Sequence, residues 1–249
     1  MQVLITGGTG GIGFAIASQF AAEGHSVVIA DLQQDAIDSK VAQLRQQGYQ
    51  AEGIVLDVTD AASITSCANR FQVDILVNNA GIQHVARLED FPPEKWAMLI
   101  NVMLTGPAML SRAMLPAMRQ RNFGRIINIG SIHALVASPF KSAYVAAKHG
   151  IVGFTKTLAL ELATAKITAN SICPGYVLTP LVEAQIPDQM KAYHMDRETV
   201  IRDVMLDKQP TKEFVTTAQI GAVAAFLASD AAAQINGAAI PVDGGWTAE

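Results

Sequence analysis

The sequence has 249 residues, of which 50% are hydrophobic and 16% are charged. Such a chain can bury a substantial core, so its composition excludes a disordered protein and favours a sheet that is covered on both faces. The formal net charge of -4 excludes the strongly basic surface that nucleic-acid binding requires, so we expect no nucleic-acid partner.

Short β-branched runs alternate with longer helical patterns along most of the chain. Seven strands are predicted at residues 2–6, 26–30, 51–56, 73–78, 125–129, 167–172 and 238–242. Helices are predicted at residues 11–23, 33–47, 61–70, 94–121, 142–163 and 217–228. This alternation is typical of βαβ units. We therefore expect one domain over residues 1–249 with a doubly wound α/β (Rossmann) fold, a parallel seven-stranded sheet with helices on both faces.

Residues 178–210 do not follow this alternation. They insert a mostly helical and polar segment between two predicted strands. Such an insertion is typical of a small helical lid over a binding crevice.

The first residues and the two cysteines indicate the cellular compartment in which the protein works. The first residues, MQVLITGG, lack the basic region of a signal peptide. No apolar run approaches the roughly 18 residues needed to cross a bilayer. Cys67 and Cys173 are too few and too far apart to suggest a disulfide framework or a metal cluster. We expect a cytoplasmic protein with no membrane segment and no metal.

The first predicted strand, a glycine-rich turn and a helix follow one another in VLITGGTGGIGFAIASQFAAEG. Gly7, Gly11 and Gly13 allow a sharp turn and a close approach of the backbone to a pyrophosphate. The helix that begins near Gly11 turns its free N–H groups and its positive dipole end toward the phosphates. The order of these elements predicts a dinucleotide site.

Asp31 ends the second predicted strand, 18 residues after Gly13. A carboxylate at this place can accept hydrogen bonds from both hydroxyls of the adenosine ribose. It would repel a 2′-phosphate, and Gly8, Thr9 and Gly10 offer no cation to offset that repulsion. The sequence therefore predicts NAD rather than NADP as cofactor. The alternative is a solvated aspartate that opens a turn.

Tyr144 and Lys148 are four residues apart in a helical segment, so they project from the same face. Ser131 lies 13 residues before Tyr144 and just past the end of a predicted strand. Ligands of open α/β sheets bind at such strand ends. A tyrosine–lysine pair on a helix is by itself usually an exposed surface pair with no catalytic role. Beside a dinucleotide site, the three groups become candidates for proton transfer.

These motifs resemble the short-chain dehydrogenase/reductase family over essentially the whole chain. The resemblance rests on TGGTGGIG, Asp57, NNAG at residues 78–81, Ser131 with YVAAK, and the Pro-Gly pair at residues 174–175. It implies hydride transfer between a nicotinamide ring and a secondary alcohol or ketone. Tyr144 is then the general acid/base, Ser131 holds the reacting oxygen, and Lys148 lowers the pKa of the tyrosine and binds the nicotinamide ribose.

The resemblance also implies the contacts of the cofactor, each with an alternative as a turn or core residue. The predicted cofactor contacts are Gly7, Thr9, Gly11, Ile12, Gly13, Asp31, Asp57, Val58, Asn79, Ala80, Gly81, Tyr144, Lys148, Pro174, Gly175, Val177 and Thr179.

A closer resemblance, to family members that interconvert (R)-3-hydroxybutyrate and acetoacetate, rests on NNAGIQHVARLEDFPPEKW, GRIINIGSIHALVASPFKSAYVAAKHG, ICPGYVLTPLVEAQI and DGGWTAE. A four-carbon oxo acid has a carboxylate that needs donors at the end of the pocket remote from the reacting carbonyl. The resemblance implies these substrate contacts: Gln83, Ser131, His133, Lys141, Tyr144, Tyr176 and Gln185. The alternatives are a family member acting on another hydroxy or oxo acid or a 3-oxoacyl substrate, and a catalytically silent NAD-binding regulator.

Two positions depart from the family pattern. Met103 stands where the family usually has an asparagine that orients a relay water, and Asn101 lies about 200° around a helix from that position. Tyr176 stands where the closer relatives tend to have a tryptophan, and Trp246 is a candidate to pack toward the site from this chain or a neighbouring one. The resemblance also implies a homo-oligomer, commonly a tetramer.

Overall fold

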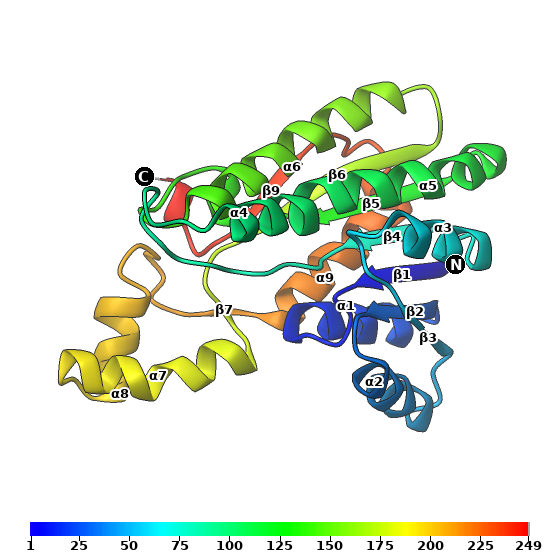
Figure 1. Cartoon of the computed structure of the whole chain (residues 1–249). Coiled ribbons are helices and arrows are strands. Elements are labelled where there is room, and N and C mark those ends of the chain that lie inside the picture. The colour runs from blue at the N-terminus through cyan, green and yellow to red at the C-terminus, as the bar shows by residue number, and fades with distance from the viewer. Residues whose placement is uncertain (249) are drawn as a thin grey trace.

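The computed structural model describes residues 1–248. Seven strands form one parallel sheet in the order β3-β2-β1-β4-β5-β6-β9, and helices cover both of its faces (Figure 1). The strands are β1 (Gln2–Thr6), β2 (Ser26–Asp31), β3 (Ala51–Val55), β4 (Ile75–Asn78), β5 (Gly124–Ile129), β6 (Ile167–Pro174) and β9 (Ala239–Val242). The predicted doubly wound fold is confirmed, and the strand bounds differ from the predicted ones by at most two residues.

Two apolar cores lie on the two faces of the sheet. The main covering helices are α1 (Gly11–Ala22), α2 (Gln34–Gln46) and α9 (Thr217–Ala228) on one face, and α3 (Ala61–Arg70), α5 (Gly106–Arg121) and α6 (Ser142–Glu161) on the other. Side chains alternate along a strand, so Val3 and Ile5 of β1 enter the first core and Leu4 enters the second. Covering both faces explains why a central strand such as β4, with the sequence ILVN, is apolar on both sides rather than alternating.

The direction of the chain across the sheet reverses at β1. This strand pairs in parallel with β2 on one side and with β4 on the other. In open α/β sheets, ligands bind outside the carboxyl ends of the strands at such a switch point. The fold therefore places a crevice beside the turns that follow β1 and β4.

The predicted helix at residues 94–121 is interrupted. The structure has α4 (Pro93–Ile100), a π-helical segment at Asn101–Thr105, and then α5. The Gly106 N–H donates to the carbonyl of Asn101, five residues back. Pro107 has no N–H, so the carbonyl of Met103 lacks the donor that a regular α-helix would provide. Periodicity alone did not reveal this interruption.

Within residues 1–248, the combined stretch Pro93–Arg121 is by length and composition able to cross a membrane, because it contains an 18-residue window with a mean hydropathy of 1.3. This corrects the expectation that no stretch reaches that length. Its Leu110, Met114 and Met118 are buried in the core between the sheet and the helices. Packing in the core therefore accounts for part of its apolar composition, since 39% of the apolar window is buried.

The predicted helical insertion is also present. It contains α7 (Pro180–Tyr193), α8 (Arg197–Val200) and a π-helical segment at Ile201–Met205. Both ends are joined by a short parallel pair, β7 (Val177–Leu178) with β8 (Val215–Thr216). Two-residue strands are too short to show a period, so the sequence did not predict them.

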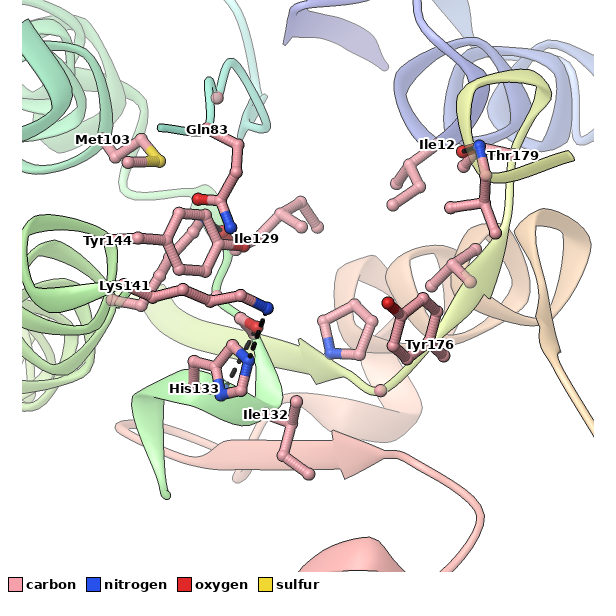
Figure 2. A pocket seen from close by; sticks show the side chains of 18 of the residues that line it. Ile12, Gln83, Met103, Ile129, Ile132, His133, Lys141, Tyr144, Tyr176 and Thr179 are labelled. Carbon is pink, nitrogen blue, oxygen red and sulfur yellow. Dashed lines mark hydrogen bonds between the residues drawn. The ribbon is translucent and has the colours of Figure 1, made fainter. Parts of the chain in front are cut away.

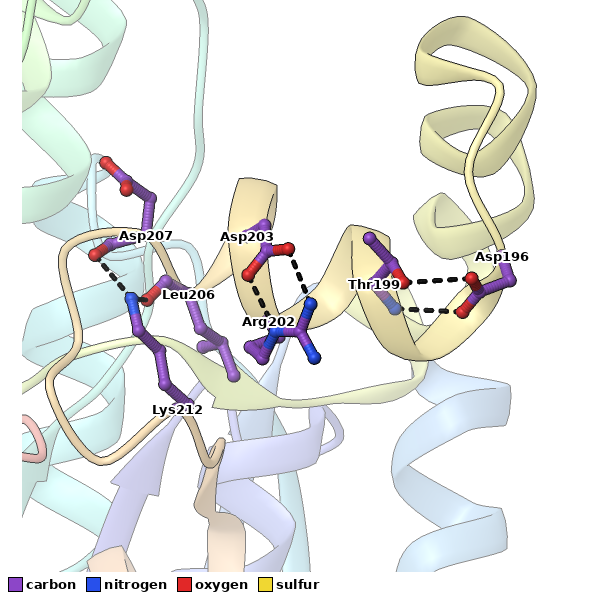
Figure 3. A network of polar contacts seen from close by, with 7 residues as sticks. All are labelled: Asp196, Thr199, Arg202, Asp203, Leu206, Asp207 and Lys212. Atoms are coloured by element: carbon purple, nitrogen blue, oxygen red, sulfur yellow. Dashed lines mark hydrogen bonds and ion pairs between the residues drawn. The ribbon is translucent and has the colours of Figure 1, made fainter.

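Local polar contacts shape the insertion, and Figure 3 shows them. The carboxylate of Asp196 accepts the Thr199 N–H at 2.9 Å and so caps α8. The Nζ of Lys212 donates to the backbone carbonyls of Leu206 and Asp207 at 3.0 and 2.7 Å. These contacts close the loop through which the insertion returns to β8.

Candidate active site

Two adjoining cavities lie at the carboxyl ends of the strands. The first, which we call the glycine-loop cavity, has a volume of about 630 Å³ and surrounds the turn after β1. The second, which we call the tyrosine cavity, has a volume of about 440 Å³ and contains Tyr144. The residues that line both cavities are Ile12, Asn79, Gly81, Ile82 and Thr179. Because they share these residues, the two cavities lie side by side, as the binding of one long ligand across both would require.

The turn after β1 has a geometry that requires glycine at two positions. Gly7 has a φ of +61°, which is costly for residues with a side chain. A β-carbon on Gly13 would lie 2.2 Å from the carbonyl oxygen of Gly7, so α1 can approach the turn only without one. Gly10 provides no side-chain cap to α1, which leaves the first N–H groups of the helix free for an anion. This cradle fits the pyrophosphate of a dinucleotide.

Asp31 is held in place at the end of β2. Its Oδ2 accepts the Thr9 N–H at 3.1 Å and also the Thr9 hydroxyl, while Oδ1 accepts the Leu32 N–H at 2.8 Å. The carboxylate therefore forms part of the wall of the glycine-loop cavity. It brings negative charge to the position at which the sequence predicts the adenosine ribose.

A threonine that the sequence analysis did not select joins the two turns of this cavity. Thr6 Oγ1 accepts the N–H groups of Asn79 and Ala80 at 3.0 and 3.1 Å. Asn79 Nδ2 donates in return to the carbonyls of Thr6 and Gly7 at 2.9 and 3.0 Å. Each predicted cofactor contact lines one cavity or the other. Their roles in binding remain predictions.

Ser131, Tyr144 and Lys148 converge in the tyrosine cavity. Ser131 lies just after β5, and its Oγ accepts the His133 N–H at 3.1 Å, which leaves the serine hydroxyl proton free to be donated. The Nζ of Lys148 donates to the Ile129 carbonyl at 2.7 Å and lies 5.6 Å from the centroid of the Tyr144 ring. Tyr144 and Lys148 point in the same direction because they are four residues apart on α6.

Burial changes the proton affinity of the two groups on α6. It lowers the pKa of Lys148 to about 8 and raises the pKa of Tyr144, an increase that the hydrogen bond from Ser131 partly offsets. Each shift favours the neutral form, as desolvation requires. For Tyr144 to act as a base near neutral pH, nearby positive charge must offset this burial. The Lys148 ammonium and an oxidised nicotinamide are both suitable sources of that charge.

His133 and Lys141 form a pair at another part of the tyrosine cavity (Figure 2). The Nζ of Lys141 lies 3.4 Å from Nε2 of His133. Burial, followed by the Lys141 charge, lowers the pKa of His133 to about 4, so its ring is neutral at pH 7. Because an ammonium only donates, His133 Nε2 must be the acceptor in this pair. His133 therefore holds Lys141 through Nε2, and its predicted contact with the substrate stays a prediction.

The remaining predicted substrate contacts also line this cavity. Gln83 comes from the loop after β4 and Gln185 from α7, and both are exposed. Figure 2 shows Tyr176 across the cavity from Tyr144. The Trp246 ring, from the same chain, lies 5.9 Å from the His133 ring in an edge-on arrangement. The described structure therefore brings the predicted acid-binding groups together around one space.

Met103 gives this cavity an apolar wall. Its side chain is 2% exposed and packs in a cluster that includes Tyr144. No carboxamide is present at this position to hold a water beside Lys148. Met103 therefore places an apolar side chain in the wall of the site, where the family pattern has a carboxamide.

Comparisons with known proteins agree with this architecture. Residues 7–247 match the family described as enoyl-(acyl carrier protein) reductase. The chain is 50% identical to a D-beta-hydroxybutyrate dehydrogenase of Rhizobium meliloti, over 99% of this chain and 98% of the relative. It is 48% identical to a D-beta-hydroxybutyrate dehydrogenase of Cupriavidus necator, over 99% and 97% of the two chains.

A crystal structure of a variant of actinorhodin polyketide ketoreductase with NADPH has the same fold. Its TM-score is 0.93 at 30% identity, and the match covers 100% of this chain and 97% of that one. The parallel sheet and the full-length similarity to these oxidoreductases lead to one assignment. The chain is an oxidoreductase of the short-chain dehydrogenase/reductase family.

Proposed function

We propose that this protein is an NAD-dependent dehydrogenase that interconverts (R)-3-hydroxybutyrate and acetoacetate. One observation carries the choice of substrate: the Lys141–His133 pair, 3.4 Å between nitrogens, lines the same cavity as Ser131 and Tyr144. A cation in that cavity matches a small acid. The similarity to two D-beta-hydroxybutyrate dehydrogenases supports the proposal.

At the ketone end, Ser131 and Tyr144 bind the reacting oxygen. When bound, the nicotinamide ring accepts or supplies the hydride. Tyr144 takes the hydroxyl proton as the alcohol is oxidised and returns it when the ketone is reduced. Ser131 donates its hydroxyl proton to the same oxygen, since its Oγ already accepts the His133 N–H. Lys148 stabilises the tyrosinate through its charge.

At the acid end, Lys141 supplies the cation for the carboxylate. His133 holds the ammonium from one side, and the amide groups of Gln83 and Gln185 can donate further hydrogen bonds. A neutral ketone would leave these polar groups without partners, so acids should be strongly preferred. Gln185 lies on α7, so substrate binding can draw the helical insertion over the cavity as a lid.

The proposed cofactor is NAD. The Asp31 carboxylate accepts hydrogen bonds from Thr9 and Leu32, and it would repel a 2′-phosphate at the same position. The related ketoreductase structure contains NADPH, so the fold itself does not exclude a 2′-phosphate, and we assign the choice between the two dinucleotides to the residue at this position. A loss of the preference for NADH in Asp31→Ser would support this assignment.

We also propose a cytoplasmic homotetramer. Apolar side chains on the helices after β4 are exposed, among them Met98 and Met109 at 48% and 42%, and the free cysteines Cys67 and Cys173 suit a reducing compartment. Sedimentation equilibrium tests the assembly, and a monomer at micromolar concentration would contradict it.

A second candidate is a related enzyme for a longer oxo acid. Tyr176 favours it, because its ring is smaller than that of tryptophan and its edge packs on Phe214, 6.1 Å between centroids. This leaves room on the side of the cavity opposite Tyr144.

Steady-state oxidation of NADH tests these proposals. We expect rapid turnover with acetoacetate, little with acetone, and much lower efficiency with NADPH. Faster turnover with levulinate than with acetoacetate would favour the longer acid. Absence of turnover with every oxo acid would overturn the proposed substrate class and leave the silent regulator as the alternative.

A further inference from the structure

Phe140, the residue directly before Lys141, has a backbone conformation that its side chain disfavours. Its φ is +65°, in the left-handed region where the β-carbon crowds the backbone of a bulky residue. Its side chain is 50% exposed, so burial of the ring gives no reason for this conformation. Unfavourable conformations persist only where the surroundings hold them, and they cluster at ligand sites.

The surroundings of Phe140 are a contact between two loops. The Ala86 N–H donates to the Phe140 carbonyl at 3.0 Å, and the Arg87 guanidinium lies 6.0 Å from the centroid of the Phe140 ring. Ala86 follows Gln83 by three residues in the loop between β4 and α4. One backbone hydrogen bond thus joins the loop of Gln83 to the turn of Lys141.

The same turn sets the start of α6. Lys141 is the N-cap of this helix, and its carbonyl accepts the Val145 N–H at 2.8 Å. Its side chain meanwhile reaches His133 Nε2 at 3.4 Å. A negative φ at Phe140 would rotate the Phe140 carbonyl relative to the helix, so the Ala86 contact and the direction of Lys141 could not both be kept.

We propose that Phe140 is a positioning residue for the acid end of the site. Its left-handed backbone, held by the hydrogen bond from Ala86, sets the separation between Lys141 and Gln83. The role belongs to the backbone of Phe140 and not to its ring. This inference rests on the proposed function, because it takes Lys141 and Gln83 to be the groups that bind the substrate carboxylate.

Two substitutions separate the backbone from the ring. Phe140→Asn removes the ring but keeps easy access to positive φ, so the KM for acetoacetate should stay within about twofold of wild type and the melting temperature should not fall. Phe140→Pro fixes φ near about -65°, so the KM for acetoacetate should rise about tenfold or more. In both variants the kcat and the NADH dissociation constant should stay within about threefold of wild type, because a misplaced Lys141 weakens uniform binding of the acid.

The proline variant also tests folding. NADH binding, followed by fluorescence, shows whether Phe140→Pro is folded, and Phe140→Val replaces it if it is not, since a β-branched side chain strongly disfavours positive φ. An unchanged acetoacetate KM in the folded proline or valine variant would overturn the proposal. An equal rise of KM in Phe140→Asn would overturn it too, because the ring would then be the important part.

Failure of this inference can be told apart from failure of the proposed function. If the wild type does not reduce acetoacetate, the proposed function is wrong and this role of Phe140 is wrong with it. If the wild type reduces acetoacetate and the variants do not differ in KM, only the role of Phe140 is wrong.

Discussion

Replacing Lys141 by methionine should weaken the binding of acid substrates and leave cofactor binding unchanged. The substitution keeps an unbranched side chain of similar length and removes the charge. It removes the charge-assisted hydrogen bond that we assign to the substrate carboxylate and also the 3.4 Å contact with His133. Lys141 lines only the tyrosine cavity, so the adenosine end of the cofactor should not sense the change.

The magnitude follows from the burial of the lysine. A hydrogen bond to a charged group contributes about 1.5–3 kcal/mol, which corresponds to a rise of roughly 10- to 150-fold in the KM for acetoacetate. Burial already lowers the pKa of Lys141, so its ammonium loses little further hydration when substrate arrives. The upper half of that range is therefore expected.

Steady-state kinetics with acetoacetate and NADH as the two varied substrates provides the assay. Lys95→Met is the matched control, because Lys95 is exposed on α4 and lines neither cavity. The Lys141 charge also lowers the pKa of His133, so that pKa should rise above about 4 in Lys141→Met, as NMR titration can show. A parallel rise in the KM for both substrates, or no rise in either, would refute the assigned role.

Three further predictions concern the glycine turn and the two proposed catalytic residues of α6. Gly13→Ala should lose NADH binding, measured by fluorescence, because its β-carbon would lie 2.2 Å from the Gly7 carbonyl oxygen; wild-type affinity would contradict the tight turn. Lys148→Met should be inactive, but it should melt at a higher temperature than wild type at pH 7. Folding lowers the pKa of Lys148 from 10.5 to about 8, so burial of the charged lysine opposes folding at pH 7. The contribution of Lys148 to stability improves as the pH rises from about 8 toward 10.5, so the difference in melting temperature should shrink over this range. A difference that is independent of pH would contradict this account. Tyr144→Phe should lower kcat by about 10²-fold or more in single-turnover measurements while NADH still binds, because it removes the hydroxyl that we propose as the general acid/base. Retention of wild-type kcat would assign proton transfer to another group.

Local sequence patterns were sufficient for the framework and for much of the candidate site. The strand, the glycine turn and the helix from Gln2 to Ala22 are contiguous, so the geometry of that turn is a local property. Tyr144 and Lys148 share a face because they are four residues apart on one helix. The seven strands were recognisable since each is an apolar run between helices, and parallel pairing follows from the crossover helices.

Other features depend on segments that are far apart in the chain, and only the tertiary structure decided them. Trp246 reaches His133 because β9 pairs with β6, and no local pattern contains that pairing. The π-helical segment around Met103 and the β7–β8 pair are likewise too short to give a period. The neutral His133 and the lowered pKa of Lys148 come from burial by several elements at once. Sequence by itself determined which chemical groups are present and how neighbouring ones are directed, whereas long-range packing decided their distances, their hydration and therefore their charge.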